Sequence, residues 1–189
     1  SHGRPPASYG AVTAQPDVSW TGATLSPSLA KAIGYWQAGC AALGLLTYVL
    51  SAAGVLPGGP QWVAAVLGYP LFVGGILFFL LALRNGVALA RGRPGAVPGA
   101  LAIQGVHSVW FAVRGGLHVQ IASGPTLGVV ISDAAVRFSA GFNASFFLGT
   151  RIAGPAWEVG FNVVAMVWTV VLLRAWVAQT PAAASVNAS

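Results

Sequence analysis

The chain has 189 residues, of which 56% are hydrophobic and only 6% are charged. A soluble domain carries roughly 25% charged residues because its surface must face water, so this composition excludes an ordinary water-facing surface. The formal net charge is +6, but the basic residues are scattered singly and do not form the basic stripe of a nucleic-acid-binding protein. We therefore expect an integral membrane protein, with the lipid bilayer and not nucleic acid as a partner.

The composition changes along the chain and predicts three regions. Residues 1–30 are rich in Pro, Ser, Thr and Gly and predict an extended N-terminal tail, with Ser28 as the N-cap of the first helix. Residues 31–178 contain the long apolar stretches of a polytopic membrane domain. Residues 179–189 are rich in Ala and are expected to form a C-terminal tail.

The first apolar stretch is long enough for two crossings, because no charged residue lies between Lys31 and Arg84. A crossing needs about 20 apolar residues, so we expect helices at about 32–55 and 61–84. The Pro-Gly-Gly-Pro sequence at 57–60 is a strong turn signal and separates them.

Small residues and a proline predict how these two helices pack. Gly34, Ala38 and Ala42 recur every four residues, and such a face lets another helix approach closely. Pro70 lies near the middle of the second predicted helix, where it should produce a kink.

Two further crossings are expected at about 96–113 and 155–177. The last one begins with Pro155, at the favoured first helical position. Trp157 and Trp176 are 19 residues apart, or about 28 Å along a helix. This spacing matches a hydrocarbon core of about 30 Å, with the two rings at its two interfaces.

The segment between these helices predicts extramembrane structure. Residues 117–121 alternate apolar and polar side chains, as a half-buried strand does. Ser-Gly-Pro-Thr at 123–126 is a turn signal, and residues 127–131 are rich in β-branched side chains. We therefore expect a short extramembrane hairpin.

An interfacial amphipathic helix is expected at about 133–150. Asp133 and Arg137 are four residues apart and should pair on one helix face. The opposite face would carry a stripe of aromatic rings, as in helices that lie in the membrane interface. The predicted fold is thus an all-α bundle of about four transmembrane helices with a short hairpin and this interfacial helix. The stripe consists of Phe138, Phe142 and Phe146.

The basic residues predict the orientation in the membrane. Arg84, Arg91 and Arg93 form the densest positive cluster, and the positive-inside rule places them on the cytoplasmic side or its organellar equivalent. Four crossings put both termini on that side. A fifth crossing at 138–150 is the alternative, and it would move the C-terminus with Arg174 to the other side. We expect a multi-pass protein of a bacterial inner membrane or an organellar energy-transducing membrane.

Basic side chains near helix ends are also candidates for contact with structural lipids. Arginine binds phosphate groups through its planar guanidinium, and anionic headgroups attract basic residues next to a membrane span. The expected headgroup contacts are Arg84, Arg91, Arg93, Arg114 and Arg151.

Polar residues inside apolar stretches are the candidate site residues, because burying them in lipid is costly. His107 and Gln104 lie in the third predicted helix, with His118 beyond its end. A neutral imidazole binds haem iron or chlorophyll magnesium, so these three are candidate contacts for haem, chlorophyll or carotenoid. Glu158 and Asn162 are the polar intramembrane residues of the last helix. The first-turn position of Glu158 predicts a carboxylate at the positive end of the helix dipole.

No catalytic motif and no cluster of metal ligands is visible in the sequence. We therefore expect no enzyme, although a membrane enzyme is a third reading. The first is a non-catalytic integral subunit of a larger respiratory or photosynthetic membrane complex, which bridges other membrane subunits and binds lipid or pigment. The alternative is a small homo-oligomeric transporter or channel, with His107, Gln104, Glu158 and Asn162 along one polar path.

Overall fold

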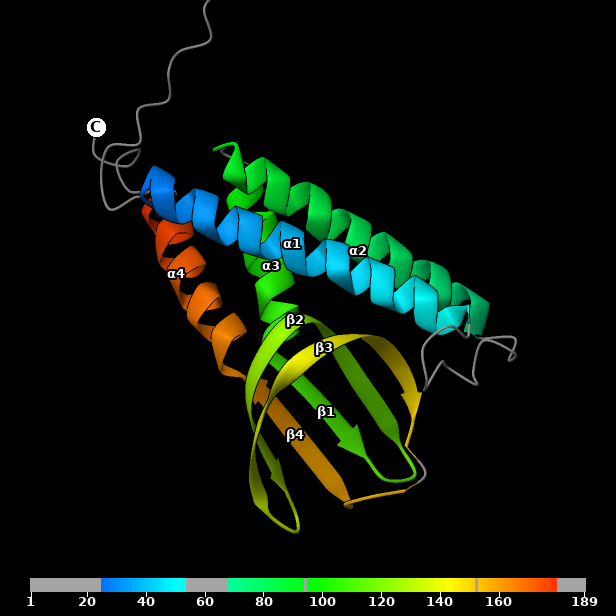
Figure 1. The fold of residues 1–189 in the computed structure, drawn as a ribbon. Coiled ribbons are helices and arrows are strands. Elements are labelled where there is room, and N and C mark those ends of the chain that lie inside the picture. The colour runs from blue at the N-terminus through cyan, green and yellow to red at the C-terminus, as the bar shows by residue number, and fades with distance from the viewer. Residues whose placement is uncertain (1–24, 54–67, 94, 152, 180–189) are drawn as a thin grey trace, which may run out of the picture.

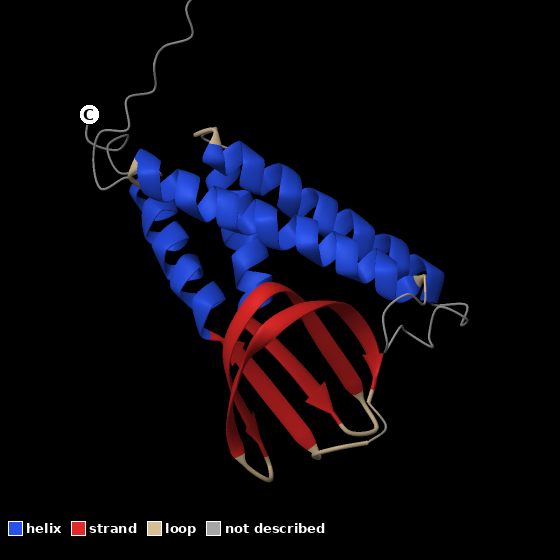
Figure 2. Ribbon diagram, in the orientation of Figure 1, coloured by secondary structure: helices blue, strands red, loops and turns tan. Residues whose placement is uncertain are grey.

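The computed structural model describes residues 25–53, 68–93, 95–151 and 153–179. In these residues four helices lie on one side and a curled antiparallel sheet lies on the other (Figures 1 and 2). The elements in chain order are α1 (Pro27–Ala52), α2 (Gly68–Ala90), α3 (Ala96–Ser108), β1 (Val109–Val113), β2 (Leu117–Ser132), β3 (Val136–Thr150), β4 (Trp157–Asn162) and α4 (Val163–Gln179).

The predicted all-α bundle is therefore wrong. Two helices, over Pro27–Leu50 and Pro70–Ala90, are long and apolar enough to cross a membrane. The other two predicted crossings, at 96–113 and 155–177, are each part helix and part strand. The predicted turn at 57–60 and most of both predicted tails lie outside the described residues.

Helix α1 begins before the predicted boundary. Pro27 occupies the first helical position, and the hydroxyl of Ser26 accepts a hydrogen bond from Leu29 N at 3.3 Å. Ser26 is thus the capping residue, in place of the predicted Ser28. Pro70 lies in the first turn of α2 and not near its middle.

The predicted small-residue face of α1 packs against α2. A Cβ atom built on Gly34 would lie 2.6 Å from the carbonyl oxygen of Gly86, and one built on Gly86 would lie 2.7 Å from the amide nitrogen of Ala38. The two backbones therefore touch where each helix has a glycine. Ala42, the third predicted member, is exposed.

Buried amides connect α1, α2 and α3. The Gln37 side chain donates to Ala82 O and to Asn85 Oδ1, both at 3.1 Å, while Gln104 donates to Gln37 Oε1 at 3.4 Å. Asn85 in turn donates to Ala96 O at 3.1 Å, across the turn between α2 and α3. Because unpaired amides are costly in an apolar core, this network fixes the register of the three helices.

A common core joins one end of all four helices. Ile33 near the start of α1, Leu89 near the end of α2, Val97 at the start of α3 and Leu172 in α4 are essentially inaccessible to solvent. The N-terminal end of α1 therefore lies beside the C-terminal ends of α2 and α4 (Figure 1).

Two of the helices run directly into strands. α3 ends at Ser108 and β1 begins at Val109, while β4 ends at Asn162 and α4 begins at Val163. β1 pairs with β4 antiparallel, and α3 packs on α4. At the junction the hydroxyls of Ser108 and Thr169 lie 3.1 Å apart. The result is two rods that lie side by side and run in opposite chain directions, and each rod is part helix and part strand.

The sheet is curled because β2 pairs with three strands. Along one edge β2 pairs with β3 over the register Leu117↔Thr150 to Ile131↔Val136. Along the other edge, its first residues pair with β1 and its last residues with β4. Since β1 also pairs with β4, the pairings form a closed circuit, and β2 and β3 arch over the other two strands (Figure 1).

The predicted hairpin and interfacial helix are thus replaced by one long hairpin. Strand β2 continues through the predicted turn at 123–126, with Gly124 at a φ of +97°. The turn comes instead after Ser132, whose hydroxyl accepts from the amides of Ala134 and Ala135 at 3.3 and 3.1 Å. The expected helix at 133–150 is strand β3.

The contact between α1 and α2 gives a matched pair of substitutions. We expect Gly34→Ala to destabilise the protein by about 1–3 kcal/mol, because the added methyl group would overlap the α2 backbone. Gly39→Ala has nothing within 4 Å of its new Cβ and should stabilise the helix by up to about 1 kcal/mol. Thermal unfolding in detergent measures both, and equal shifts in Tm would contradict the close contact.

Candidate functional site: a polar cavity inside an apolar-faced sheet

The two faces of the sheet differ in chemistry. The register of all four strand pairings places the even-numbered residues of β1, β2 and β4 and the odd-numbered residues of β3 on one face. This face is the concave, inner one. In the described residues it carries polar or small side chains at most positions, including His118, Gln120, Thr126, Arg137, Ser139, Asn143, Glu158 and Asn162.

The outer, convex face is apolar. In β2 its residues, Ser123 apart, are apolar and alternate with inner residues that are mostly polar or small, and Phe138 in β3 has 83% of its surface exposed. In a sheet that faces water, the polar residues lie outside and the apolar ones inside, so this sheet has the reverse polarity. Exposed outer residues are Val109, Phe111, Val113, Leu117, Leu127, Ile131, Val136, Phe138, Phe142, Leu148 and Trp157.

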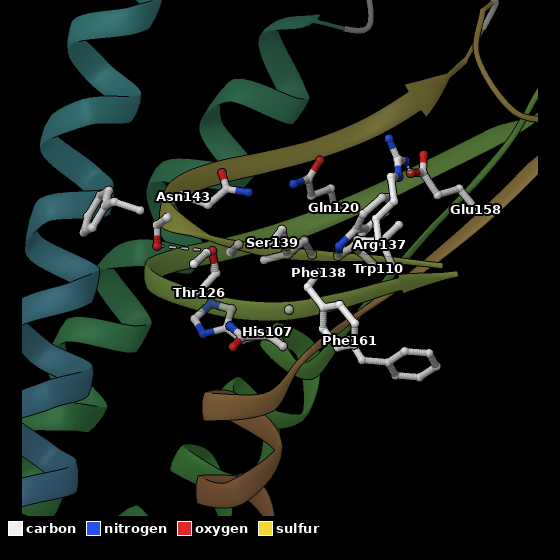
Figure 3. Close-up of a pocket in the computed structure, with 18 residues that line it drawn as sticks. His107, Trp110, Gln120, Thr126, Arg137, Phe138, Ser139, Asn143, Glu158 and Phe161 are labelled. Atoms are coloured by element: carbon white, nitrogen blue, oxygen red, sulfur yellow. Dashed lines mark hydrogen bonds and ion pairs between the residues drawn. The ribbon is translucent and has the colours of Figure 1, made fainter. Parts of the chain in front are cut away.

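The inner face encloses a cavity of about 450 Å³. His107 at the end of α3 contributes to one wall, β2 and β3 contribute amide and hydroxyl groups, and β4 contributes Glu158 (Figure 3). Asn162 of β4 also lines the cavity. Arg137 and Ser139 line the cavity and are also exposed. The cavity therefore opens along β3.

A glycine in β4 gives the cavity an aromatic floor. Trp110 and Gly160 are direct partners in the β1–β4 pairing, on the inner face. A Cβ on Gly160 would lie 2.7 Å from Cζ2 of Trp110, so only glycine lets the indole lie across the strand. Trp110 lines the cavity (Figure 3).

A three-residue ion pair closes the end of the sheet away from the helices. Glu158 in β4 is buried and pairs with Arg137 in β3 and with Arg151, which follows that strand. The two arginine side chains are 56% and 22% exposed, compared with 5% for the glutamate. Arg151 also donates from Nε to Ala153 O at 2.8 Å. The buried carboxylate is thus compensated from both sides, as a buried charge requires.

Two histidines have buried ring nitrogens without a partner. Nε2 of His107 and Nε2 of His118 have no hydrogen bond in the described part of the chain. His107 lines the cavity and lies against Phe78, with ring centroids 5.4 Å apart. His118 lies between Trp110 and Phe147, at 6.1 and 4.7 Å.

The environment of His118 opposes its protonation. Burial, and then the nearby positive charge of Arg151, lower the pKa of this imidazole. Gln120 and Glu158 act in the opposite direction but more weakly. Its surroundings therefore favour the neutral imidazole, next to the ion pair at the closed end of the sheet.

The predicted site residues are only partly brought together. His107, Glu158 and Asn162 line one cavity, whereas Gln104 is bonded to Gln37 in the helix layer. Glu158 is in a strand and not in the first turn of a helix, so it does not use a helix dipole. Asn162 Oδ1 accepts from Ala165 N at 3.4 Å, so it also caps α4. None of these placements tests the predicted contacts with haem, chlorophyll or carotenoid.

The predicted pair Asp133–Arg137 does not form. Asp133 lies in the turn after β2, where Oδ2 accepts from Ala156 N at 3.0 Å, and Arg137 pairs with Glu158. The aromatic stripe exists, since Phe138, Phe142 and Phe146 share the outer face of β3. The stripe predicted for a helix is also present in this strand, because side chains four residues apart share a face in both.

The candidate headgroup arginines fall into two groups. Arg84, Arg91 and Arg93 surround a hollow where α2 turns into α3. Arg114 and Arg151 lie at the opposite end, beyond β1 and β3, where Arg114 donates to Gly154 O at 3.4 Å.

Sequence reasoning missed Gln120, Thr126, Ser139 and Asn143, which line the cavity. For Gln120, Ser139 and Asn143 the signal was present as a two-residue alternation of apolar with polar or small side chains, over 117–121 and again over 136–146. Thr126 lies outside both runs. A helical period was assumed for residues 133–150, so the two-residue alternation in that segment was not recognised.

Comparison with known proteins gives no relative to guide the interpretation. No protein family, no curated protein and no solved structure matches this chain. Any function must therefore be argued from the site itself.

The ion pair predicts a ranking of three substitutions. Glu158→Gln should cost about 1–3 kcal/mol, because it leaves two guanidinium groups without a carboxylate; solvent reaches both arginines, so the cost is below that of a fully buried pair. Arg151→Gln should cost less, and Arg137→Gln, the most exposed partner, least. Chemical unfolding in detergent measures the order, and Asp133→Asn at the exposed turn is the control.

Proposed function

We propose that this chain is a membrane-embedded binding protein that takes the uncharged, hydroxyl-bearing headgroup of an amphipathic molecule into its sheet cavity. The observation that carries the proposal is the reversed polarity of the sheet. Lipid is the solvent in which an apolar outer face and a polar interior are favourable together, as in membrane β-structures. The proposal also rests on a more general observation, that two helices are long and apolar enough to cross a membrane.

The distribution of charge supports this placement. Among the described residues, Lys31 and the arginines of α2 and α4 lie toward the end where the four helices meet. The remaining charges are at the far end of the sheet, around Glu158. α3 and β1 together separate the two ends by about 36 Å if collinear, at about 1.5 Å per helical and 3.3 Å per strand residue. This length covers a hydrocarbon core of about 30 Å.

The chemistry of the cavity supports an uncharged headgroup. Its charged lining residues, Arg137 and Glu158, already pair with each other. The one excess positive charge of the cluster is shared with Arg151, which does not line the cavity. The other polar groups are amides, hydroxyls and the unpaired Nε2 of His107. A neutral imidazole nitrogen accepts a hydrogen bond from a hydroxyl group, and a cavity of this size is in the range of small-molecule sites.

The predicted role as a non-catalytic subunit of a larger membrane complex remains a second proposal, favoured by one observation. β3 pairs with β2 along one edge, and among the described strands no other pairs with its second edge. Open edges do not persist in hydrocarbon because each unpaired backbone group is costly. A neighbouring subunit that adds a strand to β3 would satisfy these groups.

The lipid-facing position of the sheet can be tested with spin labels. In a Cys40→Ala background, nitroxides at Leu127 and Phe138 on the outer face should collide more with oxygen than with a water-soluble nickel chelate, because oxygen partitions into acyl chains. A label at Ala134, in the turn after β2, should show the reverse. The measurement is electron paramagnetic resonance in phosphatidylcholine vesicles. Equal nickel accessibility at all three positions would show that the sheet lies in water.

The cavity can be tested with monoolein, an uncharged lipid with two hydroxyl groups, and with methyl oleate, which has none. Native mass spectrometry from detergent should show tighter binding of monoolein. His107→Leu should weaken it about fivefold, the value of one hydrogen bond. Ser139→Leu, which fills the cavity, should also weaken binding, whereas Val136→Leu on the outer face should not. Equal affinity for both lipids, or equal effects of the two leucine variants at 136 and 139, contradicts a headgroup site.

A further inference from the structure

A second hollow, of about 600 Å³, lies at the corner where α2 turns into α3, remote from the sheet cavity. Three arginines surround it. Arg84 lies in α2, and Arg91 directly follows its last residue, Ala90. Arg91 N still donates to Val87 O at 3.1 Å, so Arg91 continues the helical path and lies on the face of Arg84, seven residues before it. Arg93 lies two residues further along the chain. All three side chains are exposed.

The positive charge of this hollow is not neutralised by the described part of the protein. The described carboxylates, Asp133 and Glu158, are at the far end of the sheet, where they bind Ala156 N and two other arginines. Asn85, the neutral polar residue beside the arginines, is occupied by Gln37 and Ala96. Three guanidinium groups around one hollow thus favour a ligand with negative oxygens, since their fork geometry fits phosphate.

The surface next to the hollow is apolar. Leu77 and Leu81 precede Arg84 on the same face of α2, at the spacing of helical neighbours, and are 54% and 58% exposed. From Leu77 to Arg91 this face extends about 21 Å along the helix, more than the roughly 15 Å depth of half a hydrocarbon core. An acyl chain can therefore lie along the leucines while its headgroup meets the arginines.

From this arrangement we propose that the α2–α3 corner binds an anionic phospholipid, with the phosphate held by Arg84, Arg91 and Arg93 and an acyl chain along Leu77 and Leu81. The apolar stripe distinguishes this ligand from free phosphate, which needs only the arginines. The site is independent of the sheet cavity. It rests on the proposed membrane location only for its access to lipid.

The test is a titration of the detergent-solubilised full chain with short-chain dioctanoyl-phosphatidylglycerol, followed by native mass spectrometry. Because the lipid is added in solution, the result does not depend on the spin-label outcome or on monoolein. Arg91→Gln should weaken binding roughly fivefold, since each basic residue near a headgroup contributes about 1 kcal/mol. The matched control is Arg114→Gln, which removes the same charge at the opposite end and should leave affinity unchanged.

Two further measurements distinguish a phospholipid from a free anion as the ligand. Leu81→Ser should weaken the phospholipid without changing the charge, and inorganic phosphate at the lipid's own concentration should not displace it. Equal effects of Arg91→Gln and Arg114→Gln would overturn the proposal, because they would indicate general charge attraction. Displacement by phosphate, or no effect of Leu81→Ser, would also overturn it, in favour of a free-anion site. Circular dichroism confirms that each variant is folded, and Arg91→Lys, which keeps the charge, should lose less affinity than Arg91→Gln.

Discussion

The backbone hydrogen bonds of the sheet are the constraint on which the rest of the structure depends. At the proposed lipid-facing surface, a strand whose outer side chains are apolar needs its amide and carbonyl groups paired within the protein, because hydrocarbon offers them no water. The long β2 meets this need by pairing with β3 on one edge and with both β1 and β4 on the other. The resulting curl creates the enclosed space, and the inward side chains give that space its polar chemistry.

The helix layer follows a different rule, in which contact is made by small residues and buried amides. Gly34 and Gly86 let two backbones touch, and Gln37 supplies hydrogen bonds to two neighbouring helices. Such interactions are directional, so they specify one arrangement among surfaces that are apolar all round. The packing of the two halves of the molecule is thus specified in different ways. The sheet is specified by side chains in its interior, and the helices are specified by contacts at the interfaces between them.

Composition and the longest apolar stretches could be read from the sequence, and they gave α1, much of α2 and the close contact at Gly34. The strands that follow α3 and precede α4 could not be found in the same way, because an apolar run such as β1 has no period that separates helix from strand. Phe138, Phe142 and Phe146 satisfy both periods at once. Three residues of the candidate site, His107, Glu158 and Asn162, are predicted from the sequence and line the cavity. Their meeting depends on long-range pairing such as Ser132↔Glu158, which local patterns do not encode.

The direct passage from helix to strand has a mechanical consequence. No loop separates α3 from β1 or β4 from α4, and the Asn162 cap and the Ser108–Thr169 contact brace the two junctions. Neither rod therefore contains a loop at which its helix and strand could hinge. A wider separation of β1 and β4 would then alter the angle between α3 and α4, so a change in the sheet cavity is coupled to the helix layer without a flexible joint.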